Sequence, residues 1–334
     1  MLTNKTILVT GGTGSFGKCF TKYVLDHYDV KKIIIYSRDE FKQWMMENEF
    51  RAYQKGYESK LRFFIGDVRD GERFKRACYG VDYIIHAAAL KQVPACEYNP
   101  NEAIKTNING AMNVIDAALD CGVKKVVALS TDKAVNPVNL YGGTKLVSDK
   151  LFIAANAYAG SKDINFSVVR YGNVAGSRGS IIPLFNSIIK NGGTELPITD
   201  YRMTRFWISL TQGVELVIKA LAEANGGETF ISKIPSFKIT DLAEAMLPGC
   251  KMPEIGIREG EKLHEIMVTV EDSMTTYEYD KHYIVYPQMV WSDKQQPIPG
   301  GKKVEYGFSY SSDNNTEWLS VEDIRELLKT LDLE

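Results

Sequence analysis

Tyr141 and Lys145 lie four positions apart in the segment STDKAVNPVNLYGGTK, and Asp132 and Lys133 precede them. On a helix, residues at this spacing share one face. There the ammonium would lower the pKa of the phenol, and the phenolate would accept a proton from an alcohol as hydride leaves the carbon. Thr131 stands directly before Asp132. The segment therefore predicts a site for alcohol oxidation, with these five residues as the catalytic candidates.

The Tyr-x-x-x-Lys spacing alone is a weak signal, because it occurs four times in this chain: Tyr28/Lys32, Tyr141/Lys145, Tyr158/Lys162 and Tyr277/Lys281. Only Tyr141/Lys145 comes just after a predicted strand, KVVAL, that is followed by Ser130 and Thr131. Ligands bind at the carboxyl ends of the strands in open α/β sheets. The position of this pair in the chain, more than its spacing, marks it as functional.

A glycine-rich loop, GGTGSFG, follows the first predicted strand, TILVT, and opens a predicted helix. The helix repeats an apolar residue every four positions, so it packs on a sheet and points its N-terminus at the loop. The free N–H groups of such a terminus bind a dinucleotide pyrophosphate. We expect the cofactor to lie against Gly11, Thr13, Gly14, Ser15, Phe16 and Gly17.

The end of the second predicted strand carries a sequence, YSRDE, that bears on the choice of dinucleotide. An NAD-binding chain usually places an acid on the adenosine ribose about twenty residues past the glycines. Here Ser37 and Arg38 occupy that place, and a hydroxyl and a guanidinium suit a 2′-phosphate. We therefore predict NADP, although Asp39 and Glu40 lie close by.

Two further strand ends supply candidate cofactor contacts. Asp67 and Val68, in GDVRD, follow the third strand and are expected at the adenine. Ala87, Ala88 and Ala89, in HAAAL, follow the fourth strand. Their small side chains would let the backbone approach the cofactor closely.

The elements that must position these residues alternate between short β-branched runs and helical stretches. The predicted strands are TILVT, KIIIY, LRFFI, DYIIH, KVVAL and FSVVR, and helices are predicted over 15–27 and 40–53. This alternation predicts an α/β fold, a Rossmann-type doubly wound parallel sheet with a smaller C-terminal substrate-binding region. We expect residues 1–175 to bind NADP and residues 176–334 to be mainly substrate-binding, with some segments returning to the first domain.

Two helices further along the chain are predicted from their periodicity. After Asn99, an apolar stripe runs through Ile104, Ile108, Ala111, Ile115 and Ala118. Near the end, Ser320 and Asp323 approximate a capping box. The helix that follows presents one apolar face, made of Ile324, Leu327, Leu328 and Leu331.

Composition excludes several function classes. Forty basic and forty-two acidic residues among 334 leave a formal charge of −2, so no global field favours a nucleic acid or an anionic membrane. The five cysteines are scattered without the close pairing of a zinc site, so no metal is expected. The apolar run at the N-terminus is too short for a signal peptide, and we expect a cytoplasmic location.

The longer motifs carry a family resemblance. The glycine loop, GDVRD, HAAALK, STDK before YGGTK, and RYGNVAGSRGS resemble the extended short-chain dehydrogenase/reductase superfamily of nucleotide-sugar enzymes. More specifically, YSRDE, HAAALKQVP, STDKAVNP, DYRMTRFWI and IREGEKLHE resemble the inverting UDP-N-acetylglucosamine 4,6-dehydratases. In that family the product leads to pseudaminic acid, a sugar of bacterial surface and flagellin glycosylation.

This resemblance implies a role for each member of the Asp132–Lys133 pair. Oxidation at C4 of the sugar acidifies the proton on C5, a base removes it, an acid protonates the departing 6-hydroxyl, and hydride returns to C6. Asp132 is assigned as the general acid and Lys133, in its neutral form, as the base. Related hexose dehydratases carry an Asp-Glu pair here. Tyr141 and a water both remain candidates for the donor that reprotonates C5 from the other face.

The resemblance also implies how the substrate is held. Lys91 is expected at the sugar or phosphates, Asn173 near the phosphates, Arg205 and Arg258 at the pyrophosphate, and Glu261 at the uridine ribose. A homo-oligomer, such as a hexamer, is implied in the same way.

Three other functions remain open. A retaining 4,6-dehydratase differs only in the face from which C5 is reprotonated. A UDP-hexose 4-epimerase needs no acid at C6, so Asp132 and Lys133 argue against it. A non-catalytic NADP-binding sensor would have no need of Thr131, Tyr141 and Lys145.

Overall fold

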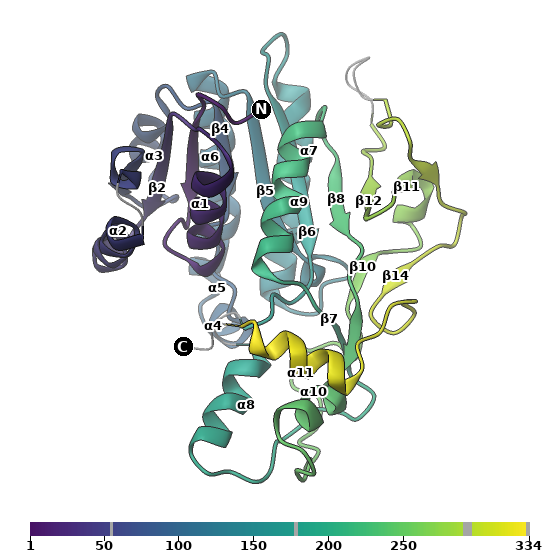
Figure 1. Ribbon diagram of the computed structural model, residues 1–334. Helices are drawn as coiled ribbons and strands as arrows, with labels where there is room; N and C mark the ends of the chain where they lie inside the picture. Colours follow the sequence, from purple (N-terminus) through teal and green to yellow (C-terminus); the bar gives the residue numbers. More distant parts are fainter. Residues whose placement is uncertain (54–55, 177–179, 290–295, 332–334) are drawn as a thin grey trace.

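A ten-stranded sheet dominates the computed structural model, which describes residues 1–53, 56–176, 180–289 and 296–331 (Figure 1). The strand order is β13-β11-β12-β8-β6-β5-β4-β1-β2-β3. Within it, the order 3-2-1-4-5-6 is that of a doubly wound dinucleotide-binding sheet, so the predicted fold class is confirmed. Its first six strands are β1 (Thr6–Thr10), β2 (Lys32–Ser37), β3 (Leu61–Ile65), β4 (Tyr83–His86), β5 (Lys125–Thr131) and β6 (Asn165–Tyr171).

These strands form because runs of β-branched residues bury both faces of a parallel sheet. In β1, Ile7 and Val9 belong to one buried apolar cluster and Leu8 to the other. All six pair in parallel with their neighbours. The carboxyl ends of the strands therefore meet at one edge, where the loops that carry the candidate residues begin.

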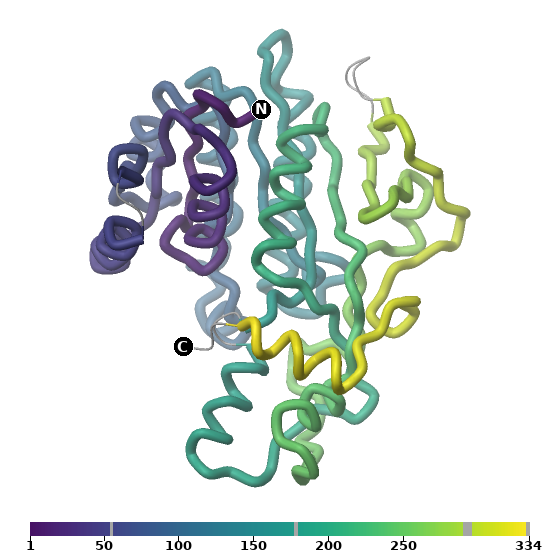
Figure 2. Tube along the Cα trace, viewed as in Figure 1, coloured from purple at the N-terminus to yellow at the C-terminus, as the bar shows by residue number. Residues whose placement is uncertain are grey.

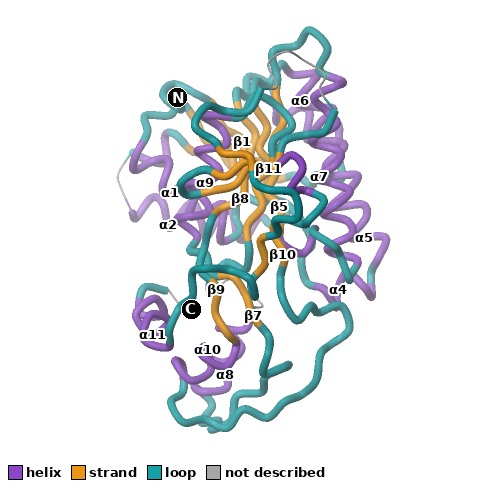
Figure 3. The backbone as a smooth tube through the Cα atoms, turned by 90° about the vertical axis from the view of Figure 1, so that its right-hand side faces the viewer, coloured by secondary structure: helices purple, strands orange, loops and turns teal. Residues whose placement is uncertain are grey.

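Helices cover both faces of the sheet, as the view from the side shows (Figure 3). The helices predicted over 15–27 and 40–53 have those bounds in the structure. One face carries α1 (Ser15–His27), α2 (Glu40–Tyr53) and α9 (Leu210–Glu223). The other carries α3 (Gly71–Cys78), α6 (Gly110–Cys121) and α7 (Leu140–Tyr158).

The helical stretch after Asn99 departs from the prediction. It consists of α5 (Pro100–Ile104), a π-helical turn (Lys105–Asn109) and α6. A π turn inserts an extra residue and rotates the helix face. Ile104 is consequently 38 % exposed, whereas Ala111, Ile115 and Ala118 are buried as expected. The single apolar stripe was therefore wrong at its N-terminal end.

The C-terminal half returns to the sheet and extends it. β8 (Thr229–Ser232) pairs in parallel with β6, and three antiparallel strands follow at that edge. They are β12 (His282–Val285), β11 (Thr276–Glu278) and β13 (Lys302–Lys303). These strands are too short for alternation to reveal them in the sequence.

A smaller helical lobe lies beyond the carboxyl ends of the parallel strands (Figures 1 and 2). It has its own core, to which Phe185, Trp207, Leu242 and Ile324 contribute. The predicted capping box between Ser320 and Asp323 is confirmed at the start of its last helix. The lobe comprises α8 (Ile181–Lys190), α10 (Ile239–Met246), α11 (Val321–Lys329) and the antiparallel pair β7 (Thr204–Phe206) and β9 (Ser236–Lys238).

Two more elements frame the site between sheet and lobe. α4 (Val93–Tyr98) follows β4, and β10 (Ile266–Val268) pairs with β14 (Tyr310–Ser311). Among the described residues, no helix is long and apolar enough to span a bilayer.

Candidate active site

A cavity of about 730 Å³ opens along the carboxyl ends of the parallel strands. It is lined by residues that directly follow β1 to β6, together with residues from α7. Every predicted cofactor residue lines it, namely Gly11, Thr13, Gly14, Ser15, Phe16, Gly17, Ser37, Arg38, Asp67, Val68, Ala87, Ala88, Ala89, Tyr141 and Lys145. The structure thus brings together segments that are far apart in the sequence.

The glycine loop is shaped for close backbone approach. Gly11 has a φ of +62°, and a Cβ there would lie 3.0 Å from the backbone of Ala88. A Cβ on Gly17 would lie 2.3 Å from the Gly12 carbonyl oxygen. The first turn of α1 can therefore approach the Gly12 backbone this closely only because residue 17 is a glycine. Gly14, the N-cap of α1, makes no side-chain capping bond, and the first turn carries no acid. The N–H groups of this turn suit an anionic pyrophosphate.

Two cationic side chains that follow β2, those of Arg38 and Lys42, also line the cavity. The Arg38 side chain is 56 % exposed, and its Nη1 lies 3.8 Å from Asp67 Oδ2. The Asp39 carboxylate accepts the Lys42 N–H at 3.0 Å and pairs with Lys42 Nζ at 2.9 Å. Asp39 is therefore engaged at the start of α2.

α7 carries the Tyr141–Lys145 pair and begins directly after Asn139. The Asn139 side chain accepts the Gly142 N–H at 2.7 Å, which caps the helix, and donates to the Gly260 carbonyl at 2.7 Å. One side chain thereby ties the catalytic helix to the loop before β10.

The phenol of Tyr141 does not have the lowered pKa that the sequence predicted. Desolvation raises its pKa to about 12, and the cation that most opposes this rise is Lys133 rather than Lys145. Burial lowers the pKa of Lys145, against the opposing charge of Asp149. Asp149 in turn accepts a hydrogen bond of 2.5 Å from Ser130.

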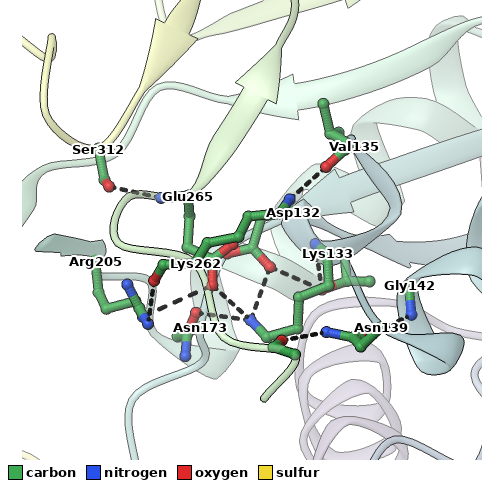
Figure 4. A network of polar contacts seen from close by, with 12 residues as sticks. Asp132, Lys133, Val135, Asn139, Gly142, Asn173, Arg205, Lys262, Glu265 and Ser312 are labelled. Atoms are coloured by element: carbon green, nitrogen blue, oxygen red, sulfur yellow. Dashed lines mark hydrogen bonds and ion pairs between the residues drawn. The ribbon is translucent and has the colours of Figure 1, made fainter. Parts of the chain in front are cut away.

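Lys133 lies at the centre of a polar network that joins three segments (Figure 4). Its Nζ donates to Asp132 Oδ1 at 3.1 Å, to Asn173 Oδ1 at 3.3 Å and to Glu265 Oε1 at 3.2 Å. The Thr131 hydroxyl donates to Asp132 Oδ1 at 2.9 Å. Lys133, Asn173 and Thr131 line the cavity, while Asp132 is fully buried beside it.

The charges in this network act on one another. Burial and the Glu265 charge raise the pKa of Asp132, although Lys133 opposes the rise. Burial alone would lower the pKa of Lys133, but the carboxylates of Asp132 and Glu265 outweigh it and raise that pKa. At rest Lys133 is therefore an ammonium and has to lose a proton before it can act as a base. Asp132, in contrast, has the raised pKa that suits a proton donor.

Glu265 was missed by the sequence reasoning. It lies within the string IREGEKLHE, but nothing in its spacing links it to Lys133, which is 132 positions earlier. Asn107 was missed as well. Its side chain bonds the backbone of Leu90 at 2.8 and 2.9 Å and donates to Thr144 on α7 at 2.9 Å. Asn107 lies in the π-helical turn, which no local signal in the sequence announces.

The predicted substrate residues divide into two groups. Lys91 and Asn173 line the cavity. The pKa of Lys91 is lowered, first by desolvation and then by Lys133. Arg205, Arg258 and Glu261 do not line it among the described residues. Residues 177–179, within the RYGNVAGSRGS string, lie outside the described residues.

Arg205 contacts several groups of the protein itself. Its guanidinium donates to the carbonyl oxygens of Thr204, Leu263 and Lys262 at 2.7 to 3.1 Å. Its Nε lies 3.6 Å from Glu265 Oε1. In the structure Arg205 thus fixes the segment before β10.

No group of histidine, cysteine or acidic side chains able to hold a metal ion occurs in the described part of the chain. Sheet order, glycine loop and Tyr141–Lys145 pair together define an extended short-chain dehydrogenase/reductase. The family model described as "Polysaccharide biosynthesis protein" matches residues 7–287, and the chain belongs to this family.

Individual relatives are similar over their full length. The UDP-N-acetylglucosamine 4,6-dehydratase (inverting) of Campylobacter jejuni subsp. jejuni serotype O:2 is 56 % identical over 98 % of this chain and 98 % of its own. The UDP-glucose 4-epimerase of Rickettsia canadensis is 43 % identical over 99 % and 97 %. The X-ray structure of Pen from Bacillus thuringiensis covers 100 % of both chains at 38 % identity, with a TM-score of 0.90.

Proposed function

We propose that this protein is a UDP-N-acetylglucosamine 4,6-dehydratase that inverts C5 and forms UDP-2-acetamido-2,6-dideoxy-β-L-arabino-hex-4-ulose. The observation that carries the proposal is the Asp132–Lys133 hydrogen bond of 3.1 Å at the wall of a dinucleotide-shaped cavity. A pair of this kind supplies the acid and the base that elimination of water across C5 and C6 requires. The 56 % identity to the inverting dehydratase supports the same assignment.

The cofactor of the proposal is NADP. The glycine loop, the uncapped first turn of α1 and the small side chains of Ala87 to Ala89 fit a dinucleotide. Arg38 and Lys42 would hold a 2′-phosphate, and the engagement of Asp39 with Lys42 reduces the acid's influence there. The nicotinamide would accept hydride from C4 and return it at C6.

Tyr141 begins the reaction as the base for the 4-hydroxyl, and Lys145 lies one turn further along α7. Because desolvation raises the pKa of Tyr141 to about 12, the phenol is protonated at rest and must first release that proton to solvent before it accepts the proton of the 4-hydroxyl. The Lys133 ammonium lowers the cost of forming the phenolate. Tyr141 therefore works with the network at Lys133, not with Lys145 alone.

One proton transfer along the Asp132–Lys133 hydrogen bond creates both groups needed for elimination. An N–H bond of Lys133 breaks and an O–H bond of Asp132 forms, which leaves a neutral amine and a carboxylic acid. The amine then takes the C5 proton while the acid gives its proton to the 6-hydroxyl, and the C6–O bond breaks to release water. Lys133 is again an ammonium and Asp132 a carboxylate, so the pair returns to its resting state. This order accommodates the raised pKa of Lys133.

Reprotonation of C5 from the opposite face gives the L-configured product. Tyr141, which holds the proton of the 4-hydroxyl, and a water are the two candidate donors. Lys133 cannot serve from its own side, since return of the same proton would retain the configuration.

The remaining parts of the proposal concern binding, assembly and location. Residues 1–175 bind NADP and residues 176–334 bind mainly the substrate. Lys91 contacts the sugar or the phosphates, Asn173 lies near the phosphates, Arg205 and Arg258 bind the pyrophosphate, and Glu261 binds the uridine ribose. The protein is a cytoplasmic homo-oligomer, such as a hexamer, and its product leads to pseudaminic acid. These points rest on the family resemblance.

A UDP-hexose 4-epimerase is the second candidate, because the Rickettsia canadensis relative of that name is 43 % identical. An epimerase exchanges no proton at C5 and forms no methyl group. The same experiment therefore separates the two functions.

The test is to incubate the protein with UDP-N-acetylglucosamine and NADP in heavy water and to follow the sugar by proton NMR. A C6 methyl signal, deuterium at C5 and L-arabino couplings are expected. A methyl signal with the D-configuration would indicate a retaining dehydratase. Change at C4 alone would indicate an epimerase, and no reaction with any nucleotide sugar would favour a sensor.

A further inference from the structure

The Lys133 ammonium has three N–H donors, and the structure supplies three acceptors. Asp132 and Asn173 belong to the catalytic turn and the segment after β6, and both follow from the sequence. The third acceptor, Glu265, comes from the segment before β10 and lies 3.2 Å from Lys133 Nζ. The three acceptors therefore orient the Lys133 side chain, and the two carboxylates among them favour its charged form.

Glu265 is held in place by its own backbone. Its N–H donates to the Ser312 hydroxyl at 2.9 Å, and its carbonyl accepts the Ser312 N–H at 2.8 Å. The residue is 2 % exposed, so its carboxylate has little freedom to turn away. Arg205 lies on its other side and holds the neighbouring carbonyls of Lys262 and Leu263.

The two carboxylates around Lys133 can accept more hydrogen bonds than they receive. Among the described residues, neither Glu265 Oε2 nor Asp132 Oδ2 has a hydrogen-bond partner, although both are buried. A buried ion pair stabilises a fold only when its remaining polar atoms are also satisfied. Stability alone therefore does not explain two carboxylates on one ammonium.

The charged groups that face Glu265 come from every neighbouring segment. They are Lys133 and Asp132 after β5, Arg205 in β7 and Lys262 in its own segment. Burial would raise the pKa of Glu265, but Lys133, Arg205 and Lys262 outweigh it and lower that pKa. Glu265 thus remains a carboxylate while Asp132 gains and loses a proton.

We propose that Glu265 is a positioning residue of the dehydration site, which directs the Lys133 amine into the cavity and controls the charge of the Asp132–Lys133 pair. After the proton moves to Asp132, the amine keeps two N–H groups, which donate to Asn173 and Glu265. Its lone pair points along the former hydrogen bond to Asp132 and becomes free for the C5 proton when the Asp132 O–H turns to the 6-hydroxyl. This inference rests on the proposed function.

The pH dependence of kcat/KM tests the control of charge. Glu265→Gln removes a negative charge, so it lowers the pKa values of both Asp132 and Lys133. The acidic and the alkaline limbs of the profile should therefore both move to lower pH. A shift of about one pH unit or more is expected from a charge at this distance. In protein labelled with ¹³C at lysine Cε, the NMR signal of Lys133 can be assigned by its loss in Lys133→Arg. In Glu265→Gln this signal should likewise begin to shift at lower pH.

Glu228→Gln is the matched control, because Glu228 is equally buried at 1 % exposure and accepts the backbone N–H groups of Asn225 and Gly226 in its loop. It should lower the melting temperature without moving the pH profile. Glu265→Asp, which keeps the charge but withdraws the carboxylate, should retain the wild-type limbs and lose kcat about tenfold or more, with KM little changed. That variant also covers the case in which Glu265→Gln does not fold.

An unmoved profile and lysine signal in Glu265→Gln, with only a lower melting temperature as in Glu228→Gln, would overturn the inference. The proposed function would survive that result, since wild-type protein would still form the methyl product. Failure of the wild-type protein to form that product would overturn the function instead.

Discussion

A Cβ placed on Gly142 would lie 2.1 Å from the carbonyl oxygen of Lys133. The first turn of α7 therefore rests directly on the backbone that carries the acid–base pair. Among the residues that the structure describes, nothing lies within 4 Å of a Cβ placed on the next residue, Gly143. Two adjacent glycines thus have opposite environments, and only the first sets the distance between Tyr141 and Lys133.

Gly142→Ala should therefore damage both stability and catalysis. The methyl group must push α7 away from Lys133, and overpacking of this kind costs about 1–3 kcal/mol. The displaced phenol should lower kcat about a hundredfold. Gly143→Ala should keep full activity and raise the unfolding free energy by about 1 kcal/mol, because alanine favours a helix. Urea unfolding and initial rates measure both, and equal behaviour of the two variants would contradict this packing.

Lys133→Ala should abolish formation of the C6 methyl group, because no amine remains to take the C5 proton. NADP affinity should stay unchanged, as measured by fluorescence titration. The variant leaves Asp132 and Glu265 without their common cation, so a lower melting temperature is also expected. Lys219→Ala, which removes a lysine paired with Glu223 on α9, should retain activity. Full turnover by Lys133→Ala would refute its role as the base.

Tyr141→Phe should stop the reaction before the proton leaves C5. Without the phenol the 4-hydroxyl keeps its proton, so bound cofactor should stay oxidised when substrate is added. Absorbance at the reduced nicotinamide band follows this directly, with Lys133→Ala as the comparison. Lys133→Ala should still reduce the cofactor, although more slowly because the Tyr141 phenolate loses its nearby ammonium, and should then stall. Reduction of the cofactor in Tyr141→Phe would assign the first base elsewhere.

The parts of the molecule that the sequence predicts are those with local signals. The bounds of α1 and α2 follow from periodicity and strand ends, and the cofactor loops follow because each one succeeds a β-branched run. Ile104 was misplaced because nothing in the apolar spacing announces a π turn. The short antiparallel strands at the sheet edge have two to four residues, too few for alternation to be visible.

The contacts that the sequence does not predict are made between distant segments. Glu265 meets Lys133 across 132 positions, and Arg205 turns its guanidinium toward backbone carbonyls at 262 and 263. The sequence shows that both side chains are charged, but it does not show which groups they contact. The raised pKa of Lys133 follows from that arrangement, since it depends on two carboxylates and not on burial alone.

Arg38→Ala should weaken NADP binding about tenfold or more and leave NAD binding nearly unchanged. The guanidinium would donate charge-assisted hydrogen bonds to the 2′-phosphate, which NAD lacks. Arg51→Ala is the control, because Arg51 lies on α2 and pairs with Glu47 away from the cavity. Dissociation constants for both dinucleotides test this. Tighter binding of NAD by the wild-type protein would reject the NADP assignment.

His86 should make the fold sensitive to mild acid. The Thr10 hydroxyl accepts the N–H groups of Ala87 and Ala88, both at 3.1 Å, so its own proton goes to His86 Nδ1 at 2.9 Å. A protonated imidazole would present a second donor to that hydroxyl. Burial, with a contribution from Lys145, lowers the pKa of His86 from 6.5 to about 3.

The sign of the effect follows from linkage. Below pH 6.5 the unfolded chain binds a proton at His86 that the native state refuses, so stability present above pH 6.5 is lost as pH falls toward 3. The loss between pH 6.5 and pH 5 should be about 2 kcal/mol. His86→Asn, which keeps an acceptor for Thr10 but does not titrate, should lack this part of the slope. Urea unfolding at several pH values measures the difference.

His27→Asn, at the exposed end of α1, serves as the control and should keep the wild-type slope. His282, whose pKa is lowered to about 4 first by burial, adds a similar slope. That slope is common to all three proteins, so it cancels in the comparison. If His86→Asn lost stability as steeply as the wild type, protonation of His86 would not limit the fold in acid.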